Sequence, residues 1–344
     1  MDRRAFIAMA AGSILSAPLA GEAQQAGKIS QIGLLFNTPP DAPRSVPFRE
    51  GLRELGYIEG KNIAFVWRPS HGRTERYTEL AGELVRLKVD VIVAPDNPTI
   101  AAAEGDQDDS DRHDPCHDPV ATGFVGSLAR PGGNITGLTT QSPETQGKTL
   151  QLLKEAVPSL SRVAILWDPT EPGRRGVARA AEGAARVLGL YVQLVEAGRP
   201  ADLESVFAAM ARDRVGAVLV QSSQMLGQNR PRIAELAIKH RLPTMGIARW
   251  FTESGPAQGT ANWSETPVPV DRSPGGLLSY GPNYSAQYRR AAYYVAKLLG
   301  GSKATDLPVE QPTHFEFVIN LKTAKALGQT IPQTLLLRAD HVIQ

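Results

Sequence analysis

Short apolar runs alternate with amphipathic stretches along almost the whole chain, and this alternation constrains the fold most strongly. Apolar runs such as residues 29–36 and 162–167 have the length of buried strands. Between them lie stretches such as residues 75–87, in which leucines recur every three or four positions, as on one face of a helix. Strands separated by helices of this length form parallel sheets with right-handed crossovers. The pattern therefore predicts an α/β protein.

The alternation falls into two series, which predicts two doubly wound parallel-sheet lobes joined by a hinge. The first lobe is expected over residues 28–139 and the second over 140–275, while 276–344 adds a strand, a helix and a C-terminal segment that crosses back between the lobes. In open parallel sheets ligands bind beyond the carboxyl ends of the strands, and two such lobes can close around a ligand. The expected strands are residues 29–36, 62–67, 89–94, 134–138, 162–167, 191–196, 217–221, 243–247 and 276–280.

Composition excludes several classes of protein. The 344 residues carry a formal net charge of +2 and only 6% aromatic residues, which argues against nucleic acid as the main partner. The single Cys excludes an internal disulfide framework and a zinc site built from several cysteines. The chain contains no HExxH, no GxSxG and no P-loop motif. We therefore expect no enzyme, no catalytic residues, no resident metal and no cofactor.

Residues 1–23 are typical of an export signal. Arg3 and Arg4 precede an apolar run that ends at Ala20, which is too short to span a membrane, and small residues then lead to a predicted cleavage site after Ala23. The RRxFI start resembles part of a twin-arginine signal, although Asp2 departs from that pattern. Export by either the Sec or the twin-arginine route is open, and the mature protein is expected in the periplasm.

Polar, turn-forming loops follow the expected strands and precede the helices. They comprise residues 37–41 and 95–99 in the first series and 168–172 and 221–223 in the second. Asp, Asn, Ser and Thr in such loops often cap the helix that follows, and this interpretation is favoured for any single residue. As a set, however, the loops lie at the same edge of each predicted sheet, which favours a ligand-binding cleft.

Several long phrases together resemble a known family. They are FREGLRELGYIEGKNIAF (48–65), DVIVAP (90–95), HDPVATGFVGSLARPGGNITGL (117–138), LLSYGPNYSAQYRRAAYYVAKLLGG (277–301) and DLPVEQPTHFEFVINLKTAKALG (306–328). The chain resembles the ABC-transporter substrate-binding proteins of the tryptophan/tyrosine-binding type, which are bacterial extracytoplasmic proteins with the type I periplasmic binding-protein fold. The resemblance implies a monomer that captures a small ligand, such as an amino acid or related carboxylate, and delivers it to an inner-membrane ABC permease.

The resemblance also gives the loop residues a role in ligand binding. Backbone donors and Asn or Thr side chains would hold a carboxylate, and Asp168 could pair with an amine. Tyr280 could stack on the ligand or form a hydrogen bond with it, or it could be an ordinary core residue at a strand end. The implied ligand-binding residues are Asn37, Thr38, Asp96, Asn97, Asp168, Gln221 and Tyr280.

Residues 104–116, EGDQDDSDRHDPC, depart from the family pattern, which has a buried strand resembling TIPIVM here. With suitable synonymous codons, a shift of one base turns this segment into KATRTIPIVMTH and most of a valine codon, which indicates a compensated frameshift. A solvated acidic loop is the second interpretation. A metal site at His113, Cys116 and His117 is the third. A frameshift would remove one strand from the first lobe.

Residues 256–275 are a second departure, because family members pass almost directly from a segment like FTESG to GLLSYG. The intervening residues are rich in Pro, Ser, Thr and Gly, which is typical of a flexible surface loop.

Beside the importer component, three functions stay open at this point: a sensory ligand-binding protein, a metal-dependent enzyme at His113, Cys116 and His117, and a decayed, non-functional family member.

Overall fold

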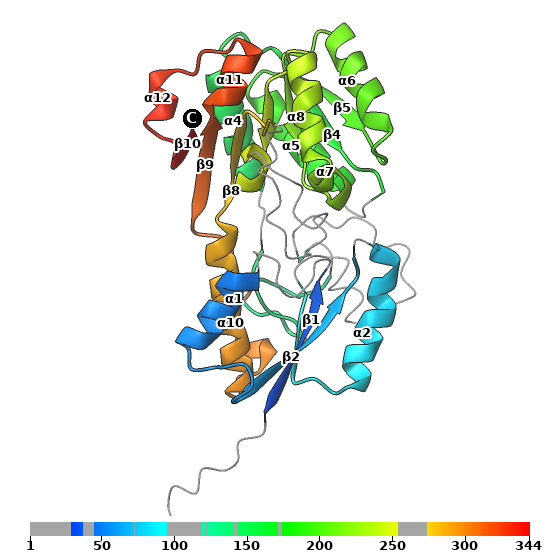
Figure 1. The fold of residues 1–344 in the computed structure, drawn as a ribbon, viewed down its shortest axis with the longest axis vertical. Coiled ribbons are helices and arrows are strands. Elements are labelled where there is room, and N and C mark those ends of the chain that lie inside the picture. Colours follow the sequence, from blue (N-terminus) through cyan, green and yellow to red (C-terminus); the bar gives the residue numbers. More distant parts are fainter. Residues whose placement is uncertain are drawn as a thin grey trace, which may run out of the picture.

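The computed structural model describes residues 29–36, 45–71, 73–94, 119–120, 123–139, 143–170, 174–253 and 274–344. Figure 1 shows two lobes, one above the other along the long axis of the molecule, each built from a sheet with helices packed against it. The predicted α/β architecture is confirmed. The predicted signal segment, residues 104–116 and most of residues 256–275 lie outside the described residues.

The first lobe contains a parallel sheet in the order β2-β1-β3, from β1 (Ser30–Phe36), β2 (Ile63–Pro69) and β3 (Val91–Val93). Apolar residues on one face of β1 pack with α1 (Ser45–Glu54), and Leu35 on the other face packs with α2 (Tyr77–Arg86). A short 3-10 turn, Thr74–Arg76, precedes α2. This burial on both faces explains why β1 is apolar from Ile32 to Phe36 rather than alternating. Among the described residues, β3 pairs with a strand on one side alone.

The second lobe contains a seven-stranded sheet in the order β10-β9-β8-β7-β6-β4-β5. Its strands are β4 (Arg162–Trp167), β5 (Tyr191–Glu196), β6 (Ala217–Val220), β7 (Thr244–Gly246), β8 (Leu278–Pro282), β9 (Phe315–Asn320) and β10 (His341–Ile343). One face carries a core with residues of α4 (Pro143–Ala156), α5 (Arg174–Val187), α11 (Leu321–Leu327) and α12 (Gln333–Leu336). The other face packs with α6 (Asp202–Arg212), α7 (Gln224–Gln228), α8 (Arg230–Lys239) and α9 (Arg249–Thr252).

The direction of β9 differs from the all-parallel expectation. Strands β4 to β8 are parallel to their neighbours, whereas β9 is antiparallel to β8, and β10 is parallel to β9. The reason is the path of the chain: it leaves the carboxyl end of β8 for the other lobe and returns to the same end of the sheet, so β9 must run in the opposite direction.

The expected strand at residues 134–138 is wrong. Of this segment, Leu138 alone forms a bridge, and it pairs with Glu310 rather than with a strand of the first sheet. Gly132 and Gly137 have φ values of 83° and 147°, a backbone conformation that interrupts an extended strand. The Thr139 N–H instead donates to the Glu310 carbonyl at 2.8 Å. The segment is therefore a connection that lies beside a later part of the chain.

Helix α10 (Tyr284–Leu299) follows β8 but packs in the first lobe, beside α1 (Figure 1). Ala292 and Val295 join the same core cluster as Phe48 of α1. The close approach requires a small residue, because a Cβ on Gly51 would lie 2.9 Å from that of Ala292. The C-terminal third of the chain thus supplies a helix to the first lobe before it returns to the second sheet.

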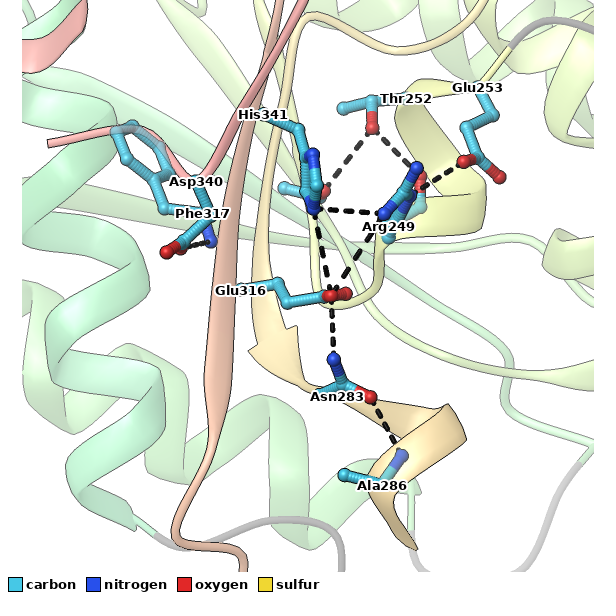
Figure 2. Close-up of polar contacts among 10 residues, drawn as sticks. Arg249, Thr252, Glu253, Asn283, Ala286, Glu316, Phe317, Asp340 and His341 are labelled. Atoms are coloured by element: carbon cyan, nitrogen blue, oxygen red, sulfur yellow. Dashed lines mark hydrogen bonds and ion pairs between the residues drawn. The ribbon is translucent and has the colours of Figure 1, made fainter. Parts of the chain in front are cut away.

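A polar network surrounds the point where the chain leaves β8 and re-enters as β9 (Figure 2). Asn283 caps α10 by accepting from the Ala286 N–H at 2.7 Å, and its Nδ2 donates to Glu316 Oε1 at 2.7 Å. Arg249 Nη1 lies 2.9 Å from His341 Nε2 and 4.0 Å from Glu316 Oε1. The two crossing segments are therefore fixed to each other and to α9 and β10.

Glu310, on the segment that returns to the second lobe, is expected to make stability depend on pH. Its carboxylate accepts two hydrogen bonds from Arg290 of α10, at 2.7 and 2.5 Å, and this pairing lowers the pKa of Glu310 from its ordinary value. A lowered pKa in the folded state means that the stabilisation is complete at neutral pH and is lost as pH falls through the folded pKa.

We expect Glu310→Gln to lower the free energy of unfolding by up to about 1 kcal/mol at pH 7, because the pair is partly exposed and screened by solvent. The difference from the parent chain should shrink as pH falls toward 4. Urea unfolding at both pH values measures it, and an equal difference at the two pH values would contradict this account.

Candidate functional site

The carboxyl ends of the parallel strands in each lobe point toward the other lobe (Figure 1). Strand β1 ends toward the second lobe, and β8, which is parallel to β7, continues directly into the first-lobe helix α10. The loops that follow these strands are where side chains for ligand binding were expected. Four of the expected residues, Asn37, Thr38, Asp96 and Asn97, lie outside the described residues. The second-lobe half of the candidate site can be described in detail.

Asp168 directly follows β4 and is 1% exposed. Its Oδ1 accepts from the Thr170 N–H at 2.9 Å and from the Thr170 hydroxyl at 2.7 Å. This arrangement is a local turn in which the side chain replaces a backbone acceptor. The carboxylate of Asp168 is therefore held in one orientation at the end of β4, in a buried position.

Gln221 directly follows β6 and is 2% exposed. Its backbone N–H donates to the Leu166 carbonyl at 2.9 Å, which extends the ladder between β6 and β4 by one residue. Its side-chain Nε2 donates to Oε1 of Gln146, near the start of α4, at 3.1 Å. Its Oε1 is buried and has no hydrogen-bond partner among the described residues. Gln221, which the sequence predicted, is therefore hydrogen-bonded to Gln146, which the sequence did not indicate.

Tyr280 lies in β8 and packs against the core cluster of the second lobe. Its ring stacks on that of Phe315, with the centroids 5.5 Å apart and the planes 11° from parallel. Burial raises the pKa of the Tyr280 hydroxyl from its ordinary value, and the nearby Asp340 carboxylate adds to the effect. These contacts favour the alternative in which Tyr280 is a core residue, although it lies in the middle of β8 rather than at the strand end that the sequence predicted.

Two further residues stand near the carboxyl ends of β6 and β7. Arg230, the first residue of α8, is only 7% exposed, and its guanidinium lies over the ring of Trp250 in α9 at 6.0 Å. Ser223 caps the short helix α7, which lies between β6 and α8 in the chain, by accepting from the Leu226 N–H at 3.0 Å. Sequence reasoning missed Arg230 because a charged residue at the start of a helix is usually exposed. Its guanidinium is covered by Trp250 of α9, which was not expected as a separate helix.

A pocket of about 380 Å³ lies elsewhere in the first lobe, between α1 and the start of β2. Its lining includes Ile63, the first residue of β2, so it opens near the amino end of that sheet, away from the facing carboxyl ends.

Among the described residues, no group of three or more metal-ligating side chains is found. His113, Cys116 and His117 lie outside them. Within the same described part, no helix is both long and apolar enough to cross a membrane.

The model of one family, described as ABC transporter substrate binding protein, matches residues 44–261 and 266–343. The chain belongs to this family. The match spans both lobes and the crossing segments, and its interruption at 262–265 falls within residues 256–275, which the sequence marked as an insertion. The family of substrate-binding proteins is extracytoplasmic and works with ABC permeases.

This ABC transporter substrate-binding protein is similar to individual relatives and solved structures at low sequence identity. A tyrosine-binding protein of Clostridioides difficile is 22% identical over 281 residues, which cover 81% of this chain and 75% of the relative. A conserved domain protein of Vibrio cholerae has a TM-score of 0.76 at 24% identity, covering 92% of this chain and 100% of the other. A domain from Streptococcus pneumoniae in complex with L-Trp has a TM-score of 0.75 at 22% identity, with the same coverage. These structural similarities establish the fold.

Proposed function

We propose that this protein is the extracytoplasmic solute-binding component of an ABC-type importer, and that it captures an amino acid or related carboxylate between its two lobes. The observation that carries the proposal is the match of the family model over both lobes, on a structure whose two sheets direct their strand ends toward each other. The name of the C. difficile relative and the L-Trp bound by the S. pneumoniae structure support aromatic amino acids as the first candidates.

The buried polar groups of the second lobe support a ligand with an amine. Asp168 places a buried carboxylate at the end of β4, where it could pair with an ammonium group. Gln221 places a buried amide oxygen at the end of the neighbouring β6. On this proposal, Asn37, Thr38, Asp96 and Asn97 complete the site from the first lobe.

On this proposal, the protein is exported and passes its ligand to a permease. The segment 1–23 directs export by the Sec or twin-arginine route and is removed after Ala23, and the mature protein acts as a monomer in the periplasm. It delivers its ligand to an inner-membrane permease and catalyses no reaction. Mass spectrometry of the exported protein tests the cleavage site directly.

A thermal-shift screen of the mature protein against the twenty amino acids and small carboxylates tests the ligand class. A ligand that binds the folded state alone stabilises it by RT ln(1 + [L]/Kd), which is about 2.7 kcal/mol at a hundredfold excess over Kd. For a domain of this size we expect a rise in Tm of several degrees for one or a few chemically related amino acids. Unchanged melting with the whole set would reject the amino-acid assignment.

A further inference from the structure

Two buried polar atoms without partners lie at the ends of neighbouring strands in the second lobe. The indole Nε1 of Trp167, the last residue of β4, and the side-chain Oε1 of Gln221 have no hydrogen-bond partner among the described residues. Trp167 is 3% exposed and Gln221 is 2% exposed. Leaving buried donors or acceptors unpaired costs free energy, so native proteins retain few of them, and those that remain need an explanation.

The sheet register places the two residues side by side. Strands β4 and β6 are parallel, with Leu166 opposite Val220, so the next residues along, Trp167 and Gln221, are also neighbours. In each strand the alternating residues that precede them, such as Ile165 and Leu219, belong to the core on the α4 and α5 side. Both side chains therefore stand on the same face of the sheet, at its carboxyl edge.

Gln146 determines which atom of Gln221 is left without a partner. Because Nε2 of Gln221 donates to Oε1 of Gln146 at 3.1 Å, the remaining polar atom of Gln221 is an acceptor. The unpaired atom of Trp167 is a donor, since an indole nitrogen cannot accept. A group that satisfies both atoms must carry an N–H or O–H donor beside an acceptor, as the ammonium and carboxylate of an amino acid do.

We infer that Gln221, oriented by Gln146, accepts a hydrogen bond from the ammonium group of the bound ligand and thereby selects amino acids over the corresponding carboxylic acids. Trp167 donates to an acceptor of the same ligand. This inference rests on the proposed function and deepens it, because it assigns a chemical preference to one side chain. The competing occupant is an ordered water molecule that bridges the two atoms and has no role in recognition.

A comparison of two probes on two proteins separates these possibilities. L-tryptophan and indole-3-propionate have the same ring and carboxylate, but the second lacks the amine. We expect Gln221→Met, which removes the acceptor and keeps an unbranched side chain, to weaken L-tryptophan binding about tenfold or more. Binding of indole-3-propionate should change less than about twofold. Calorimetric titration of both probes measures the two ratios.

Gln193 provides a matched control in the same sheet. It too has a buried Oε1 without a partner, and its Nε2 donates to Asp213 at 2.9 Å, but it lies within β5 rather than at a strand end. Gln193→Met should leave the affinity for both probes unchanged. Gln221→Glu keeps an acceptor oxygen toward the ligand, while the Gln146 amide turns to donate to the other carboxylate oxygen. This variant should therefore keep the preference for L-tryptophan, which guards against a methionine variant that folds poorly.

Three results would overturn the inference, and they differ from one another. Equal weakening of both probes by Gln221→Met would show a structural role or a bridging water, and no change in either would show that Gln221 does not contact the ligand. Binding of neither probe nor any other amino acid to the parent protein would reject the proposed ligand class, and the inference would fall with it.

Discussion

Replacing Gly281 by alanine should lower the free energy of unfolding by about 3 kcal/mol or more, or prevent the second lobe from folding. Gly281 is buried in β8, beside the end of β7, and a Cβ at this position would overlap the carbonyl oxygen of Ile247. The obstacle is backbone rather than the flexible end of a side chain, so relief requires β7 and β8 to separate. The same movement would displace Asn283 and the crossing segment that follows.

A second glycine-to-alanine change should have the opposite sign. Gly183 lies within α5, and an added Cβ there would meet no atom within 4 Å. Alanine is the better helix former by about 0.5–1 kcal/mol, so Gly183→Ala should stabilise the protein by that amount. Urea unfolding of both variants beside the parent provides the comparison. A Gly281→Ala variant as stable as the parent would show that β7 and β8 do not pack as the structure describes.

Restoring the family-like strand should stabilise the first lobe. The change replaces residues 104–116, EGDQDDSDRHDPC, by KATRTIPIVMTHV, which has the same length and supplies the apolar run IPIVM. Within the described residues β3 pairs with β1 alone, and its side chains Val91, Ile92 and Val93 are half-buried. A new strand beside β3 would pair its open edge and cover this apolar surface. We expect a gain of about 2 kcal/mol or more, seen as a rise in Tm of roughly 5 °C.

The control for this replacement is a segment of the same composition in which the apolar residues are dispersed. It should not raise the Tm, because a dispersed pattern cannot form a buried strand. Equal melting of the parent and the restored protein would contradict the frameshift interpretation. So would a gene sequence whose codons for residues 104–116 cannot encode IPIVM in either shifted frame.

The strands with the clearest sequence signals were the easiest to predict. Residues 162–167 and 191–196 are apolar or bounded by turns, and they form β4 and β5 with those limits. The prediction for residues 134–138 was wrong because isolated apolar residues after a glycine-rich turn resemble a strand. Leu138 alone forms a bridge, and its partner is Glu310, far away in the sequence. The reversed direction of β9 follows from where the chain re-enters the sheet, which no local pattern contains.

The candidate site was predictable to a smaller extent. The rule that ligands bind at the carboxyl ends of parallel strands led to Asp168 and Gln221, which the structure places directly after β4 and β6. It could not indicate Gln146, because that contact depends on how α4 packs across the sheet edge. Nor could it distinguish a ligand contact from the stacking of Tyr280 on Phe315, which joins β8 to β9.

Calorimetric titration of the mature protein with the amino acids that raise its Tm measures whether this chain captures an amino acid between its lobes. We expect saturable binding of one amino acid per chain, at a single site that Gln221→Met weakens and Gln193→Met leaves unchanged. Titrations without heat for every amino acid, L-tyrosine and L-tryptophan included, would contradict the claim that this chain captures an amino acid between its lobes.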